Sequence, residues 1–231
     1  MRAAFFATSA LCLVSAVIYV ALDAPIKAQA INPRPEAPSR ITLAALRGVA
    51  ASPARLPVIM VCIGAGIWAG VANFQTVYAD ARGLDYASFF AAYTGTVVVF
   101  RLILARFKGG ANPYLTIALL QYVMCASLVL FIFSGDNLPL YLLVAVLFGL
   151  GYGVSYPILV AMTANDADED LGAQTLQLFA LTYFVGVFGF PLVAGTILVE
   201  MGTRPLLVLV AVMAMIEATM ALRRAVLRRM A

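Results

Sequence analysis

Seven apolar stretches, each about as long as a bilayer is thick, fill most of this chain and leave mainly short polar loops between them. Because an α-helix rises about 1.5 Å per residue, about 20 apolar residues cross the hydrocarbon core of a membrane. The stretches comprise residues 3–22, 56–79, 86–105, 113–135, 138–164, 171–199 and 205–222. Only two charged residues, Arg101 and Glu217, lie within them. The sequence therefore predicts an all-α integral membrane protein with seven transmembrane helices, embedded in a lipid bilayer.

The composition argues against several classes of function. Hydrophobic residues make up 64% of the chain and charged residues 11%, values with which a soluble domain would expose large apolar patches. The longest polar stretch, residues 23–55, has the length of a linker and leaves no room for a separate catalytic domain. The chain has no histidine, and its three cysteines lie inside apolar stretches, where they act as small apolar residues. We therefore expect no enzyme, no metal or cofactor site, no disulfide framework and no nucleic-acid partner.

The basic residues sort by the side of the membrane on which their loops would lie. One side carries twelve of the 15 basic residues, namely Lys27, Arg34, Arg40, Arg47, Arg55, Arg101, Arg106, Lys108, Arg223, Arg224, Arg228 and Arg229. The other side carries three, Arg2, Arg82 and Arg204. Because Lys and Arg accumulate in cytoplasmic loops, this partition predicts a multi-pass protein of the inner (plasma) membrane, with its N-terminus outside and its C-terminus in the cytoplasm.

The first stretch has a second interpretation. Met1 and Arg2, an apolar run and the small residues 28–30 also fit a secretory signal peptide with its cleavage site. The apolar run is longer than the usual core of a signal peptide, and cleavage would leave the arginine-rich tail outside the cell. The charge partition therefore favours a retained helix.

The polar linker contains one segment with helical periodicity. After Ser39, a suitable N-cap, the residues Leu43, Leu46 and Val49 would share one side of a helix that Pro53 would stop. Such a helix would lie on the membrane surface. A disordered basic linker is the alternative.

Three motifs stand out in the apolar stretches: the run from Asn73 to Tyr93 followed by Arg101, the glycine-rich, proline-terminated run 148–157, and the run 186–195. The first looks like the seventh and eighth helices of the Major Facilitator Superfamily (MFS) of transporters. The second resembles the tenth helix of that family, and the third resembles its eleventh. Their order and spacing agree along most of the chain, although each motif alone is weakly specific.

The resemblance implies a domain organisation for the whole chain. Residues 1–22 would correspond to the sixth helix of the family, 23–55 to the basic cytoplasmic linker between its two halves, and 56–222 to its C-terminal six-helix domain, followed by a basic cytoplasmic tail at 223–231. The chain would then be a fragment, a truncated reading frame or a half-size subunit. Its partner would be a second six-helix half.

In such folds the substrate lies near the membrane midplane between two six-helix halves. Polar side chains inside the spans are therefore candidates for a substrate cavity, because they are unfavourable there without a watery cavity or a partner. The candidates are Asn73, Gln75, Tyr78, Arg101, Tyr152, Tyr156 and Gln177. The alternative for the amides is helix–helix hydrogen bonding, and for the glycines around Tyr152 it is close helix contact.

The two charged residues inside spans each have two interpretations. Arg101 lies about one turn from the cytoplasmic boundary, so it can extend to the headgroups, make a structural contact, or face the cavity and attract anionic substrates. Glu217 is a candidate for proton coupling, and its alternative is a surface-reaching carboxylate paired with Arg223 or Arg224.

These observations predict part of a secondary active transporter that moves a small solute by alternating access. Seven helices would also fit a receptor or a non-transporting membrane assembly protein. The last span contains no lysine for a Schiff base, which argues against a retinal pigment. The glycine-rich spans and the basic linker suit a transporter better than other receptors.

Overall fold

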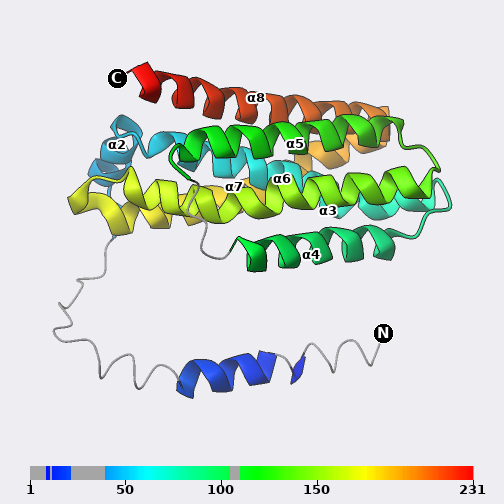
Figure 1. Ribbon diagram of the computed structural model, residues 1–231, viewed down its shortest axis with the longest axis horizontal. Helices are drawn as coiled ribbons and strands as arrows, with labels where there is room; N and C mark the ends of the chain where they lie inside the picture. The colour runs from blue at the N-terminus through cyan, green and yellow to red at the C-terminus, as the bar shows by residue number, and fades with distance from the viewer. Residues whose placement is uncertain (1–8, 11, 22–39, 105–109, 231) are drawn as a thin grey trace. The chain divides into compact units, whose positions relative to one another are not determined.

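The computed structural model describes residues 9–10, 12–21, 40–104 and 110–230, with side chains as far as residue 227. The chain divides into two compact units, Met1–Ser39 and Arg40–Ala231. In the first unit a short apolar helix covers Cys12–Ala21 (Figure 1). It accounts for part of the predicted span 3–22; residues 9–10 are also helical, and the rest of that span lies outside the described residues.

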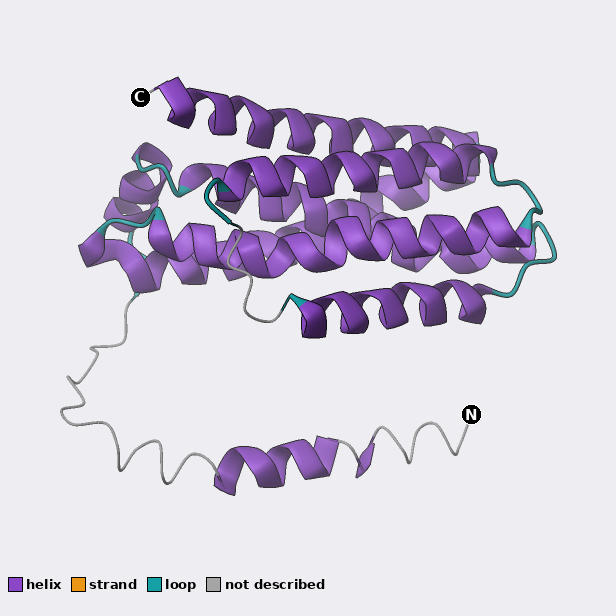
Figure 2. Ribbon diagram, viewed as in Figure 1, coloured by secondary structure: helices purple, strands orange, loops and turns teal. Residues whose placement is uncertain are grey.

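The second unit is a bundle of helices, and Figure 2 shows no strand in the part of it that is described. Its helices are α2 (Leu43–Ala51), α3 (Arg55–Asp80), α4 (Tyr86–Ile103), α5 (Pro113–Phe133), α6 (Leu138–Asn165), α7 (Gly172–Met201) and α8 (Thr203–Met230), with a short 3-10 helix, η1, at Glu169–Leu171. The six helices α3 to α8 are each long and apolar enough to cross a membrane. The all-α membrane fold is therefore confirmed.

Local sequence explains where these helices begin and end. The side chain of Asp85 accepts hydrogen bonds from the first turn of α4, and Asn112 and Asn137 do the same for α5 and α6, each with a proline in the first turn. Gly202 separates α7 from α8 with a φ of 87°, a left-handed conformation that favours glycine. The α8 helix continues beyond the predicted end at residue 222, because arginine is a good helix former and favours the C-terminal end of a helix dipole.

The six long helices are buried to very different extents. The pairs α5·α8, α3·α7, α5·α6 and α4·α6 make the main contacts of the bundle. In the most apolar 18-residue stretch of α3, 61% of the residues are buried, whereas in the corresponding stretches of α4 and α7 only 11% and 22% are buried. Figure 1 shows α4 along one edge of the bundle. Two apolar helices therefore leave most of their surface uncovered by the unit itself.

The glycine run of α6 lets neighbouring helices approach closely. A Cβ atom at Gly151 would lie 2.7 Å from the backbone nitrogen of Met124 in α5, and one at Gly149 would lie 2.9 Å from the carbonyl oxygen of Tyr93 in α4. Neither distance leaves room for a side chain. The structural interpretation of this run, close helix contact, is confirmed.

The predicted helix in the linker is present as α2, and its N-cap is Thr42, whose hydroxyl accepts a hydrogen bond from Ala45 N. The predicted cap, Ser39, lies outside the described residues. Val49 is buried, but Leu43 and Leu46 are 63% and 43% exposed. The α2 helix contacts α3 and α7 and leaves both leucines uncovered, so its contact with the membrane surface stays a prediction.

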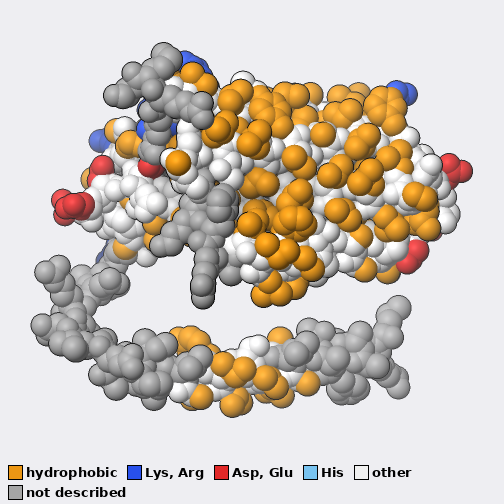
Figure 3. Space-filling view, viewed as in Figure 1, with side chains coloured by type: hydrophobic (Ala, Val, Ile, Leu, Met, Phe, Trp, Pro, Cys, Tyr) orange, Lys and Arg blue, Asp and Glu red, His pale blue; other side chains and the backbone are white. Residues whose placement is uncertain are grey.

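Charged side chains gather at the two ends of the six-helix unit, and hydrophobic side chains cover its length (Figure 3). We call the end at which α3 begins and α8 ends the basic end, because Arg55, Arg223 and Arg224 lie there. Arg82 and Arg204 lie at the opposite end. This separation is the one expected for a unit that crosses a bilayer.

Candidate functional site

Five aromatic side chains from four helices meet on one side of the six-helix unit. We call them the aromatic cluster: Trp68 of α3, Tyr93 of α4, Tyr152 and Tyr156 of α6, and Tyr183 of α7. The rings of Trp68 and Tyr152 stack with centroids 6.3 Å apart, and those of Tyr156 and Tyr183 meet edge to face at 5.6 Å. All five side chains are partly exposed. The cluster is therefore a platform with an open side.

Ring contacts between helices hold this platform. Tyr93 joins it through Phe148 of α6, whose ring centroid lies 5.7 Å from that of Tyr93 and 5.9 Å from that of Tyr152. Aromatic side chains combine a large apolar surface with a polar edge, which suits the binding of small molecules. The predicted candidates Tyr152 and Tyr156, one helical turn apart, lie together in this cluster.

Arg101 of α4 is hydrogen-bonded to α6 at a carbonyl that a proline leaves without its helical donor. Its Nε donates a hydrogen bond of 3.1 Å to the carbonyl oxygen of Gly153. In a regular helix that carbonyl would accept from the residue four positions later, which is Pro157 and has no N–H. Arg101 therefore satisfies a carbonyl that the proline leaves free. This is the structural contact foreseen as one alternative for Arg101.

The remainder of the Arg101 side chain is exposed beside the aromatic cluster. Its hydrogen bond places the guanidinium at Gly153 of α6, which lies between Tyr152 and Tyr156 in the sequence. Within the described residues, no carboxylate pairs with Arg101. The guanidinium is thus held in place by one hydrogen bond and keeps other donors for a further partner.

Gln75 and Tyr78 lie in a different place from the aromatic cluster. Both are buried, and the side-chain amide of Gln75 donates to the hydroxyl of Tyr141 in α6. The Tyr78 hydroxyl lies 2.8 Å from Ser134 Oγ after the end of α5. The adjoining cavity of about 20 Å³ has room for about one water molecule. Both side chains therefore form hydrogen bonds to other parts of the bundle, and for Gln75 this is the predicted alternative to a substrate contact.

Asn73 and Gln177 are both exposed side chains. Asn73 lies on α3, and its amide donates a hydrogen bond of 2.8 Å to the carbonyl oxygen of Ala69, one turn earlier. Gln177 lies in the first turns of α7. The structure therefore brings neither residue into the buried contacts that hold Gln75 and Tyr78.

Glu217 is fully buried in the middle of α8, with 0% of its surface exposed. Gln121 Nε2 of α5 donates to its Oε1 at 2.9 Å and lies 3.5 Å from Ser155 Oγ of α6. A Cβ at Gly64 of α3 would lie 3.3 Å from the same carboxyl oxygen. We call Gln121, Ser155 and Glu217 the carboxyl cluster. It joins α5, α6 and α8, and the glycine of α3 makes room for it.

The carboxyl cluster corrects one expectation. Glu217 does not reach the surface to pair with Arg223 or Arg224, because its carboxyl group points into the bundle, where Gln121 is its donor. The second carboxyl oxygen and the amide oxygen of Gln121 have no hydrogen-bond partner among the described residues. Gln121 was not among the candidates predicted from the sequence. Only the packing of α5 against α8 shows that these two polar residues lie opposite each other.

Metal binding finds no support in the part of the chain that the structure describes. No group of three or more histidine, cysteine or carboxylate side chains lies close enough to hold a metal ion there. The free cysteines Cys62 and Cys125 belong to α3 and α5. The aromatic cluster, Arg101 and the carboxyl cluster are the candidate functional groups.

Comparison with known proteins agrees with this architecture. Residues 1–191 match the family model described as "Major Facilitator Superfamily". A solved structure of the POT family transporter PepTSo is similar in fold, with a TM-score of 0.64 and 15% sequence identity. The match covers 73% of this chain and 36% of that chain, so this chain corresponds to little more than a third of that transporter. No curated protein matches the chain.

Proposed function

The chain belongs to the Major Facilitator Superfamily, and from that premise we propose that it forms one six-helix part of a secondary active transporter, which moves a small solute by alternating access. The family and the fold are those of membrane transporters, and the chain is a multi-pass membrane protein. This favours a transporter over the alternatives of a receptor, an assembly protein or an enzyme.

One observation carries the proposal: two of the four helices that supply the open aromatic cluster, α4 and α7, are the helices that the unit buries least. In their most apolar stretches only 11% and 22% of the residues are buried. In transporters built from repeated units, the substrate binds near the midplane, between the units. A second six-helix unit placed over α4 and α7 would cover the cluster and complete such a site. The second unit belongs either to the same polypeptide or to a partner chain.

Tyr152, Tyr156 and Arg101 are the substrate contacts that we propose first. The two tyrosines offer ring faces and hydroxyls, and the free donors of Arg101 would favour an anionic solute. Asn73 and Gln177 are exposed candidates for polar contacts. We assign Gln75 and Tyr78 to the support of α3, because their polar groups already bond to residues of other helices.

Proton coupling is the proposed role of Glu217. The carboxyl group connects through Gln121 to Ser155, whose hydroxyl donates to the carbonyl oxygen of Tyr152 at 2.9 Å. A change of charge at Glu217 would thus act on the segment of α6 that carries the aromatic cluster. The desolvation of a charged carboxylate in an apolar interior gives such a change a large energetic effect.

The test is an uptake and efflux screen with membranes that contain the complete gene product. Tyr156→Ala should reduce transport by about tenfold or more, because it removes a ring from the site. Leu119→Ala removes an exposed apolar side chain from α5, away from the cluster, and should leave transport within about twofold. Equal transport by both variants, at equal amounts in the membrane, would contradict the proposed site.

A further inference from the structure

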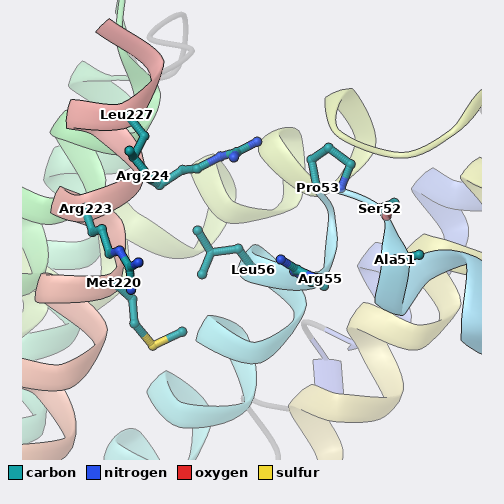
Figure 4. Close-up of a pocket in the computed structure, with 9 residues that line it drawn as sticks. All are labelled: Ala51, Ser52, Pro53, Arg55, Leu56, Met220, Arg223, Arg224 and Leu227. Atoms are coloured by element: carbon teal, nitrogen blue, oxygen red, sulfur yellow. The ribbon is translucent and has the colours of Figure 1, made fainter. Parts of the chain in front are cut away.

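A second cavity lies at the basic end, apart from the aromatic cluster. It has a volume of about 560 Å³ and opens between the turn from α2 to α3 and the last turns of α8. Three arginines line it, Arg55, Arg223 and Arg224, together with apolar side chains such as Leu56 and Leu227. Figure 4 shows the side chains of Arg55 and Arg224 extending from α3 and α8 into the space between the two helices. The cavity therefore gathers three positive charges over an apolar wall.

These positive charges are not neutralised within the described residues. None of the three arginines forms an ion pair there. Arg55 makes one long hydrogen bond, 3.4 Å, to the carbonyl oxygen of Ala50. The Nε of Arg224 is buried without a hydrogen-bond partner, although its guanidinium lies 5.9 Å from the ring centroid of Tyr114. A buried donor without an acceptor and three like charges in one cavity are both unfavourable, and an anion would relieve both.

The residues that line the cavity indicate which kind of anion would bind there. Guanidinium groups present several N–H donors in a fixed plane and bind phosphate oxygens in pairs. The volume lies within the range of small-ligand sites, about 300–1,000 Å³. The cavity lies at the ends of membrane-crossing helices, which is the depth at which lipid headgroups lie. Basic pockets between such helices bind anionic headgroups.

We propose that this arginine pocket binds a phosphate-bearing anion, and specifically the headgroup phosphate of an anionic phospholipid. The apolar residues Leu56, Met220 and Leu227 would contact the first carbons of the acyl chains, which a free phosphate lacks. Because the pocket joins the ends of α3 and α8 to the turn after α2, a bound lipid would stabilise this end of the unit.

The test measures retention of phosphatidylglycerol by the full chain in detergent, using native mass spectrometry. The double variant R223Q/R224Q should retain this lipid about tenfold less than the unchanged protein. The control R40Q/R204Q removes the same charge from two exposed arginines that do not line the pocket, and should retain it within about twofold. R223K/R224K keeps the charge and should recover part of the retention.

A parallel arm separates the two sources of phosphate. Inorganic phosphate and glycerol 3-phosphate are titrated while thermal unfolding is followed. If R223Q/R224Q loses lipid retention and neither soluble anion protects the unchanged protein against thermal unfolding, the pocket is a lipid site. Protection of the unchanged protein that R223Q/R224Q loses identifies a site for a soluble phosphate ester and corrects the proposed source. Equal behaviour of R223Q/R224Q and the unchanged protein in both arms, or an equal loss in R40Q/R204Q, would overturn the proposal.

Discussion

At the scale of single residues, the polar groups inside the spans are explained by what they hydrogen-bond. Arg101 compensates for the missing N–H of Pro157, and Gln121 provides the donor for Glu217. Few alternatives exist for such groups in an apolar interior, where an unsatisfied donor or acceptor is costly. Each pairing therefore makes a prediction about stability that does not depend on the transported solute.

The pairing of Arg101 with the Gly153 carbonyl can be tested with a double-mutant cycle. Arg101→Leu should lower the free energy of unfolding by about 1–2 kcal/mol, because it leaves the carbonyl without a donor. In a Pro157→Ala background, the backbone N–H of the introduced alanine can supply the missing helical hydrogen bond. The same Arg101 substitution should then cost less than about 0.5 kcal/mol. Thermal unfolding of the four purified proteins measures the coupling, and purely additive effects would show that the two residues act independently.

The carboxyl cluster makes a second prediction. Glu217→Gln keeps a hydrogen-bonding group of similar size opposite Gln121, so the free energy of unfolding should change by less than about 1 kcal/mol. Glu217→Ala leaves a void and an unpaired amide, and should lower it by about 2–4 kcal/mol. The comparison uses chemical or thermal unfolding in one detergent. If the Glu217→Ala protein were as stable as the Glu217→Gln protein, the carboxyl cluster would not contribute to the stability of the fold.

At the scale of elements, small residues decide which helices touch. The α6 helix lies against the backbones of α4 and α5, because Gly149 and Gly151 carry no Cβ. The least covered helices, α4 and α7, leave their apolar sides for lipid or for another unit.

The close contact of α6 with α5 predicts an asymmetry between two glycines. Gly151→Ala places a Cβ 2.7 Å from Met124 N and should lower the free energy of unfolding by about 1–3 kcal/mol, because the helices must separate. Gly189→Ala in α7 meets nothing within 4 Å, so it should be neutral or stabilise by up to about 1 kcal/mol through helix propensity. Unfolding experiments on the two variants make the comparison. Equal destabilisation would mean that space at Gly151 does not set the contact.

The helices could be predicted from sequence, whereas most side-chain pairings could not. Each of the helices α3 to α8 is long and apolar enough to cross a bilayer, so its own stretch of sequence is enough to predict it. The pairings of Gln75 with Tyr141 and of Gln121 with Glu217 join residues 66 and 96 positions apart. Which faces meet depends on helix packing. Tyr152 and Tyr156 could be grouped because they share one helix, but Trp68 and Tyr183 join them only through the tertiary fold.

At the scale of the whole molecule, the partition of positive charge makes a prediction about topology. We expect the basic end of the unit to face the cytoplasm, since the positive-inside rule follows Lys and Arg in short loops. A reporter that works only in the cytoplasm should be active when it is fused after Ala231. A reporter that works only outside the cytoplasm should be active when it is inserted in the turn at Gly135, between α5 and α6. The reverse pattern would invert the orientation of the unit and the side from which the arginine pocket meets lipid.

The account depends most on the open side of the aromatic cluster facing water rather than lipid. Its direct test replaces the native cysteines, Cys12, Cys62 and Cys125, by alanine and compares single cysteines at positions 156 and 119 in membranes. A charged thiol reagent should label Tyr156→Cys quickly, because a transport cavity admits water. Leu119→Cys, on the exposed side of α5, should react at least about tenfold more slowly. Labelling of position 156 only by a lipid-soluble reagent would contradict the account.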